Sequence, residues 1–226
     1  MKSVNIDRSP KFSGTLYNPR WFKQERVDVL QDEVDRVSFG TIITVTTSGI
    51  MASHVPMLID RSRGDLGTLF GHVARGNSQW RESSPEGHGL AVFLGPDAYI
   101  SPSWYKTKEE TSKVVPTWNY VAIHVRGPVT FFEEAERLRG IVTKLTEHHE
   151  AYSKKPWKIT DAPPDYVSGE LKQIVGFEMP IVKIEGKWKM SQNRSDADQN
   201  SVMTHLLERD RLRDEEVSYE MKRPES

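Results

Sequence analysis

The segment from Val114 to Gly127 limits the possible folds more than any other part of the chain, because its apolar residues recur at every second position. This spacing is that of a β-strand, in which successive side chains point to opposite faces. The two sets are Val121, Ile123 and Val125 on one face and Trp118, Tyr120, His124 and Arg126 on the other. One face of the predicted strand therefore belongs to a core, and the other face contacts something else.

Shorter runs on either side of this segment predict more strands. They lie at 41–47, 52–60, 67–73 and 90–94, with a last pair at 174–184 and 187–192. Ser48-Gly49 and Glu185-Gly186 are typical hairpin turns, and Gly95-Pro96 is expected to end the strand before it. Helical spacing of apolar residues marks 27–37, 135–149 and 196–209, and residues 153–167 are expected to form a loop.

No strand-helix-strand unit is visible in this order of elements. Consecutive antiparallel strands are therefore expected to close into a small barrel with helices at its edges. The predicted class is α+β, mainly β. Residues 1–15 are polar and predict a disordered extension, residues 16–209 form the expected domain, and residues 210–226 predict a loose charged tail.

The composition excludes several classes of function. Lys and Arg number 31 and Asp and Glu number 32, so no overall field draws the chain to nucleic acid or to an anionic membrane. The absence of cysteine excludes disulfides, thiolate catalysis and cysteine-based metal sites. Because the chain shows neither a signal-peptide pattern nor an apolar run of membrane-spanning length, we expect a soluble, cytoplasmic protein.

Three stretches place Trp or Tyr beside Asn, Ser, Arg or His at the ends of apolar runs. They are Gly71–Trp80, Gly95–Tyr105 and Val115–Tyr120. Loops at the ends of strands are common places for binding residues, and an aromatic surface next to polar groups suits a planar ligand with a polar tail. These stretches are the candidate site.

The same stretches resemble the PaiB family of FMN-binding split-barrel proteins, whose bacterial members are named as negative transcriptional regulators. The matching residues are GHVARGNSQW at 71–80, GPDAYISPSWY at 95–105 and VPTWNY at 115–120, with LYNPRWF at 16–22 before them and IVGF at 174–177 and KMSQNR at 189–194 after them. The resemblance implies a split β-barrel with peripheral helices, with FMN as its cofactor. Ser78 stands where the family has proline, a difference that affects only the start of a short helix.

The first stretch can supply a receptor for the FMN phosphate. Arg75 offers a forked guanidinium, and Asn77 can cap a helix whose free N–H groups favour an anion. A surface salt bridge is the alternative role for Arg75. His72 can bond a phosphate or a ribityl hydroxyl, or be a buried neutral side chain tied to a backbone carbonyl. His54 shares a strand face with Leu58, where a single histidine is usually structural, but by the resemblance this strand runs beside the flavin ring, which makes His54 a candidate contact.

The second and third stretches supply further candidates. Ser101 and Trp104 lie on a proline-stiffened loop that can present a hydroxyl donor and an indole, although serines in such turns also cap backbone groups. Trp118 and Asn119 cannot face the same side of one regular strand. If Asn119 bonds the flavin, Trp118 packs across a subunit boundary, where tryptophan is favoured.

The resemblance also implies a homodimer, because split barrels build the flavin site between two subunits. Gln192 and Arg194, two residues apart after the last strand, are then the contribution of the second subunit. A plain surface charge is the alternative for Arg194.

Three functions are compatible with these residues. The first is a flavin-dependent oxidoreductase with a small-molecule redox partner, and the second is a flavin-loaded transcriptional regulator. The third is a haem-binding barrel with His54, His72 or His124 as the iron ligand. The chain shows no helix-turn-helix pattern, and its basic residues are matched by acids, so we expect no direct binding to DNA. Gly-x-Gly-x-x-Gly, P-loop and zinc-protease motifs are absent from the sequence.

Overall fold

The computed structural model describes residues 14–84 and 87–223, and these contain nine strands and seven α-helices. The strands make a large antiparallel sheet, and the class is α+β, mainly β. The contacts divide the chain into two compact units, and strands β5 (His88–Ile100) and β6 (Thr117–Pro128) carry residues of both. Most of the predicted extension at 1–15 lies outside the described residues.

In the described chain the first unit comprises residues 14–15, 41–84, 87–91 and 125–183. Its strands neighbour one another in the order β2 (Phe39–Thr46), β3 (Gly49–Asp60), β4 (Thr68–Ala74), β8 (Ile174–Pro180) and β7 (Thr130–Phe132). The turn between β2 and β3 lies at the predicted place, and Gly49 there has φ of 116°, a conformation that favours glycine. Antiparallel pairing sets Leu58 opposite Phe70 and His72 opposite Gly176.

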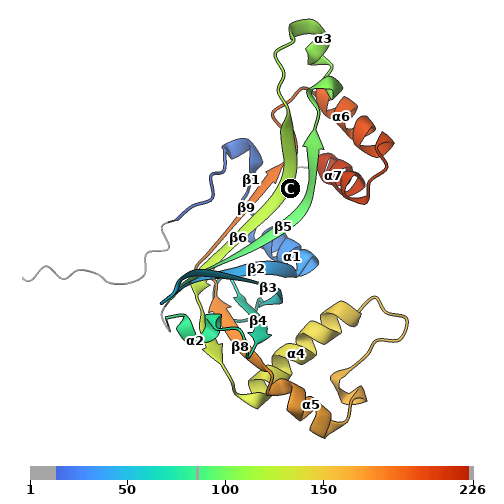
Figure 1. Cartoon of the computed structure of the whole chain (residues 1–226). Helices are drawn as coiled ribbons and strands as arrows, with labels where there is room; N and C mark the ends of the chain where they lie inside the picture. Colours follow the sequence, from blue (N-terminus) through green and yellow to red (C-terminus); the bar gives the residue numbers. More distant parts are fainter. Residues whose placement is uncertain (1–13, 85–86, 224–226) are drawn as a thin grey trace, which may run out of the picture. The chain divides into compact units, whose positions relative to one another are not determined.

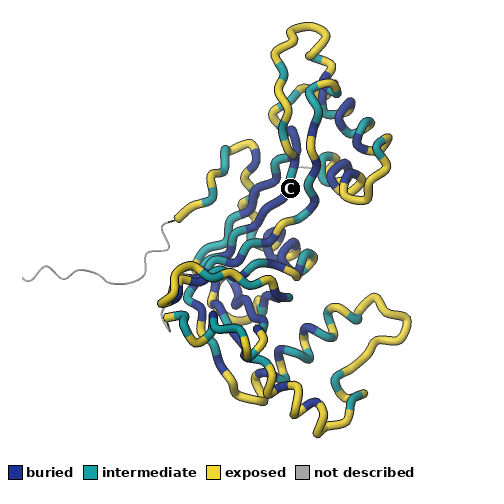
Figure 2. Tube along the Cα trace, viewed as in Figure 1, coloured by how far each residue is buried: buried dark blue, intermediate teal, exposed yellow. Residues whose placement is uncertain are grey.

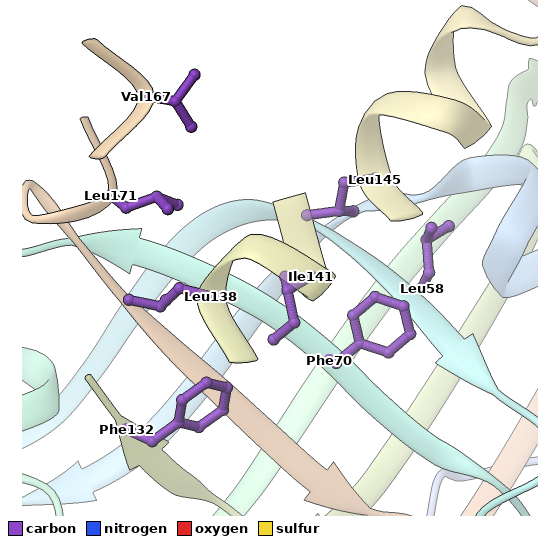
Figure 3. Packing of buried hydrophobic residues seen from close by; sticks show 8 residues of the cluster. All are labelled: Leu58, Phe70, Phe132, Leu138, Ile141, Leu145, Val167 and Leu171. Carbon is purple, nitrogen blue, oxygen red and sulfur yellow. The ribbon is translucent and has the colours of Figure 1, made fainter. Parts of the chain in front are cut away.

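Helix α4 (Ala135–Glu150) covers one face of β3 and β4, and α5 (Pro164–Leu171) lies next to α4 (Figure 1). Apolar side chains meet between them, as Figure 3 shows: Leu58, Phe70, Phe132, Leu138, Ile141, Leu145, Val167 and Leu171. In Figure 2 the buried residues of α4 alternate with exposed ones along the helix, as expected of an amphipathic helix packed on a sheet.

The end of β3 is tied to α4 by a carboxylate. Asp60 accepts hydrogen bonds from the Ser62 hydroxyl at 2.6 Å and from Lys144 Nζ at 3.0 Å. These bonds lower the pKa of Asp60 to about 2 from 3.8. The ionised carboxylate therefore stabilises the fold above about pH 4, and this contribution is lost as the pH falls through 2.

We expect Asp60→Asn to lower the free energy of unfolding by about 1 kcal/mol at pH 7, a value reduced because the ion pair is partly solvated. Urea denaturation at pH 7 and near pH 2 tests this, with the exposed Asp65→Asn as the control. The difference between Asp60→Asn and wild type should disappear at the lower pH. An equal difference at both values would show that the carboxylate charge contributes nothing.

The second unit comprises residues 16–40, 92–124 and, as far as the structure describes the chain, 184–223. Its strands neighbour one another in the order β1 (Lys23–Gln24), β9 (Lys183–Lys189), β6 and β5. Its helices are α1 (Val27–Val37), α3 (Thr107–Thr111), α6 (Asp196–Glu208) and α7 (Leu212–Lys222), and α6 packs on α7 (Figure 1). The predicted helices at 27–37 and 196–209 are confirmed. The alternation in β6 is confirmed too, with Asn119 and Val121 buried and Trp118 exposed.

Two predictions based on glycine are wrong. The strand expected to end at Gly95 continues to Ile100, and the hairpin expected at Glu185-Gly186 does not form, because Gly186 pairs with Gln24 inside β9. In both places the glycine serves close packing. A Cβ on Gly95 would lie 2.7 Å from a Glu33 oxygen, and one on Gly186 would lie 2.1 Å from Leu30.

Two segments expected to be irregular are partly helical. Residues 153–167 contain a short 3-10 helix (Ile159–Asp161) and the start of α5. Residues 212–222 of the expected loose tail form α7, which buries Asp214, Val217 and Ser218.

Candidate functional site

His72 and His54 lie on one face of the β3–β4 pair. Leu58, opposite Phe70, belongs to the face that α4 covers, and even-numbered residues of both strands share that face. The paired part of β3 and β4 ends at Met57 and Gly71, and by strand alternation His54 lies on the same face as Leu58 and His72 on the same face as Phe70. Past the apolar contacts with α4, the face thus carries two imidazoles.

The two imidazoles have different surroundings. His54 is exposed, and its Nδ1 bonds the Thr41 hydroxyl at 2.8 Å, which leaves Nε2 toward solvent. The Nδ1 atom of His72 is buried and has no hydrogen-bond partner among the described residues. Burial lowers the pKa of His72 below its usual value, so the ring is neutral at pH 7. The backbone-carbonyl role that the sequence left open is not seen for this atom.

A buried polar network fixes the turn after β4. Asn77 accepts from the Gln79 backbone N–H at 2.9 Å and donates to the Ser53 hydroxyl at 2.7 Å, and Ser53 in turn donates to Gln79 Oε1 at 2.6 Å. Gln79 is fully buried, and its amide also bonds Thr44 Oγ1 and two backbone carbonyls. Asn77 thus bonds the first residue of helix α2 (Gln79–Glu82), but the N-cap position is Ser78 and not Asn77, and α2 has only four residues and little helix dipole.

Arg75 is engaged inside the first unit. Its guanidinium pairs with Glu133 and donates to the backbone carbonyls of Lys172 and Ile174. This is the salt-bridge role that the sequence left open as the alternative to phosphate binding. The bond network ties the end of β4 to β8 and to the residue after β7.

The sequence analysis did not identify Arg81, which lies in helix α2, after Arg75 in the chain. Its guanidinium lies over the Trp80 ring, 4.7 Å from the centroid, and donates to the Arg75 carbonyl at 3.2 Å. Trp80 donates to the same carbonyl through Nε1 at 3.0 Å. Within the described residues Arg81 has no carboxylate partner, so it keeps its charge available at the turn. Its position directly after the matched stretch is the signal that could have identified it.

In the second unit, Ser101 and Trp104 lie at the 3-10 helix Pro102–Trp104. The Ser101 hydroxyl accepts from the Ser103 backbone N–H at 3.2 Å, which is the capping role expected of a turn serine. Trp104 stacks on His205 of α6, with ring centroids 5.6 Å apart, and Arg209 lies 5.0 Å from the Trp104 centroid. These contacts hold the indole in one orientation.

Trp118 and Asn119 face opposite sides of β6. Trp118 is 52% exposed and meets the edge of Tyr99 at 6.0 Å, so two aromatic rings lie open on this part of the unit. Asn119 is fully buried, and its side chain accepts from the Ser191 hydroxyl at 3.0 Å and lies 3.5 Å from the sulfur of Met221 in α7. Asn119 therefore joins β6 to the segment after β9.

The residues after β9 are held by internal bonds. Gln192 donates to the Trp188 carbonyl at 2.6 Å and accepts from the Met190 N–H at 2.7 Å. Arg194 lies over the Tyr105 ring at 4.7 Å and has no carboxylate partner among the described residues. Nearby, Lys189 donates to the Thr117 hydroxyl and the Trp118 carbonyl, and burial together with the charges of Lys187 and Arg194 lowers its pKa.

The predicted residues thus fall into two groups. His54, His72, Arg75 and Asn77 belong to the first unit, and Ser101, Trp104, Trp118, Asn119, Gln192 and Arg194 belong to the second. The first group offers a neutral imidazole with a free acceptor or donor, and the second offers open aromatic rings with cations beside them. In the described ranges no three His, Asp or Glu side chains are placed to hold a metal ion, and no helix has the length and apolarity to cross a membrane.

Sequence comparisons give one family. Residues 16–183 match the family model described as "Putative FMN-binding domain". The chain is also 35% identical over 191 residues to the protease synthase and sporulation protein PAI 2 of Bacillus subtilis, covering 84% of this chain and 89% of that protein.

Solved structures with the same fold are distant in sequence. The FAD- and haem-binding protein of Mycobacterium smegmatis aligns with a TM-score of 0.53 at 13% identity and covers 79% of each chain. The flavocytochrome of Azotobacter vinelandii aligns with a TM-score of 0.52 at 9% identity, over 80% of this chain and 75% of that one. These likenesses establish a split-barrel fold.

Proposed function

The chain belongs to the PaiB-type family of FMN-binding domains, and from this premise we propose that it binds FMN and uses it for electron transfer with a small molecule. FMN is proposed in preference to other flavins because of the family match. When bound, FMN would supply hydride and single-electron chemistry. The residues of the chain would bind it, orient it and exclude water from it.

The observation that carries the proposal is the buried Nδ1 of His72 without a partner. A buried polar atom that makes no hydrogen bond costs about 1–3 kcal/mol, and such atoms are rare in folded proteins. A ligand hydroxyl or carbonyl on the same face would remove this cost. We assign His72 to a ribityl hydroxyl or a ring polar atom of FMN, and His54, through its free Nε2, to the same ligand.

The phosphate of FMN requires a cation that is not already neutralised. Arg75 is paired with Glu133, whereas Arg81, in helix α2 just after that turn, has no carboxylate partner in the described chain. Guanidinium groups bind phosphate through paired N–H donors. We therefore assign the phosphate to Arg81, and to Arg75 and Asn77 the role of holding the turn.

We propose further that the protein is a homodimer and that the second protomer contributes to the flavin site. Its Trp118 is exposed, and Arg194 carries a charge with no acid beside it in the described residues, as such a contribution requires. Aromatic residues and arginine are enriched in protein interfaces. The internal bonds described above would then hold this surface in place. They are made by Ser101, Trp104, Asn119 and Gln192.

Discrimination between FMN and riboflavin tests the phosphate assignment. Arg81→Gln is expected to weaken FMN binding about tenfold, which corresponds to the loss of a charge-assisted hydrogen bond, and to leave riboflavin binding unchanged. Fluorescence titration measures both affinities, and Lys172→Gln is a matched control because its exposed side chain carries an equal charge in the same unit. Equal affinity of the wild-type protein for FMN and riboflavin would contradict the assignment.

Redox function is tested separately. Anaerobic mixing of the FMN-loaded protein with NADH or NADPH should bleach the flavin absorbance, and air should restore it. If neither nucleotide bleaches the flavin and the protein retards a specific DNA fragment in a salt-sensitive manner, the regulator function replaces the oxidoreductase function.

A further inference from the structure

A cavity of about 550 Å³ lies wholly within the second unit. It is bordered by the chain before α1, by β9 and by the end of α7, and its apolar lining includes Trp21, Phe22, Trp188, Met190 and Met221. Small-molecule sites typically enclose about 300–1,000 Å³ and combine aromatic walls with a few placed polar groups. The volume of this cavity falls in that range, and its lining combines aromatic and methionine side chains with eight polar or charged residues.

Most charges around the cavity are already paired. Lys23 pairs with Glu25, Arg26 pairs with Asp28 at 2.6 Å, and Arg223 approaches Glu220 at 3.5 Å. Glu220 is 8% exposed and also accepts from the Trp188 indole N–H at 3.1 Å, which fixes the plane of that ring. These groups therefore leave little net charge for a ligand.

Arg20 is the exception. Its guanidinium lies over the Trp21 ring, 4.5 Å from the centroid, and no described carboxylate pairs with it. Trp21 itself is 54% exposed. A stacked arginine keeps its N–H donors free at the edge of the ring, where they can bond a carboxylate while the indole faces a flat partner.

We propose that this cavity is a second ligand site, which binds a small planar aromatic anion. The ring of the ligand would lie among Trp21, Trp188 and Met190, and its anionic group would bond Arg20. The proposal rests on the lining and charges of this cavity and not on flavin binding by the first unit, although Gln192, which supports the proposed flavin surface, also lines the cavity. It gives a function to α7, which supplies Met221 and Glu220 and lies outside the residues matched by the family model.

Binding of 1-naphthoate to the full chain, measured without FMN and again with FMN at saturation, tests the proposal. We expect quenching of tryptophan fluorescence, a dissociation constant below about 1 mM, and at least tenfold weaker binding of the neutral analogue 1-naphthalenemethanol. Saturating FMN should leave the naphthoate affinity unchanged. Competition between the two would place naphthoate in the flavin site and overturn the proposal.

Variants locate the site. Arg20→Gln should weaken naphthoate binding about tenfold and leave binding of the neutral analogue unchanged, while Trp21→Ala should weaken both. Lys23→Gln is the matched control, because Lys23 lines the cavity but is neutralised by Glu25. All three residues have exposed side chains, so the variants should fold. Naphthoate affinity that is equal in wild type, Arg20→Gln and Trp21→Ala, or no binding at 10 mM, roughly ten times the expected limit, would contradict the proposal.

Discussion

Replacement of His72 by phenylalanine is expected to weaken FMN binding about ten- to a hundredfold without destabilising the protein free of flavin. Phenylalanine keeps a planar ring on β4 but cannot bond a ligand. It also removes the buried Nδ1 that has no partner in the described structure, so the free energy of unfolding should stay equal or rise by about 1 kcal/mol. A structural histidine would behave in the opposite way, because its loss would lower stability.

Flavin titration and urea denaturation measure the two effects on the same samples. His149→Phe is the matched control, since it makes the same change on the exposed last turn of α4. It should alter neither quantity. A stable His72→Phe protein with wild-type FMN affinity would show that the imidazole makes no bond to the flavin.

Truncation after Arg211 is expected to lower the free energy of unfolding by about 4 kcal/mol or more. It removes α7, whose Val217 is fully buried, and full burial of such a side chain is worth about 2 kcal/mol. It also removes Asp214, which bonds Arg209 through both carboxylate oxygens at 2.5 and 2.6 Å. Loss of one partner of a buried ion pair costs about 3–5 kcal/mol, less here because Arg209 is partly exposed.

Chemical denaturation of the truncated and full-length proteins gives the difference. Tyr219→Ala, on the exposed side of the same helix, is the control and should change stability by less than about 0.5 kcal/mol. If the truncated chain were as stable as the full one, α7 would contribute no packing, and the interpretation of residues 210–226 as a loose tail would be restored.

The sequence predicts the elements whose two faces differ. The alternation in β6 and the apolar stripe of α1 are confirmed, because in each element the buried side chains recur mainly on one side. Prediction from the sequence fails for α7, because two of its three buried residues, Asp214 and Ser218, are polar and leave no apolar periodicity. It fails also at Gly95 and Gly186, because a glycine needed for close packing and a glycine needed for a turn look the same in a sequence.

Prediction of the site has a similar limit. The exposure of Trp118 followed from strand periodicity, whereas placing His54 and His72 on one face required the register between β3 and β4, which only the fold shows. The partner of Arg75 could not be predicted, because Glu133 lies on a distant segment that only the fold brings near. Gln79 was missed because its burial depends on polar partners in two other strands.

The central claim is that FMN bonds the buried imidazole of His72, and the side-chain ¹⁵N NMR signals of this residue test it most directly. The signals should be recorded with and without one equivalent of FMN per chain. We predict a neutral ring in both states, with a clear shift of the Nδ1 signal when FMN binds. Saturation of the protein by FMN with no change in the His72 ring signals would contradict the account.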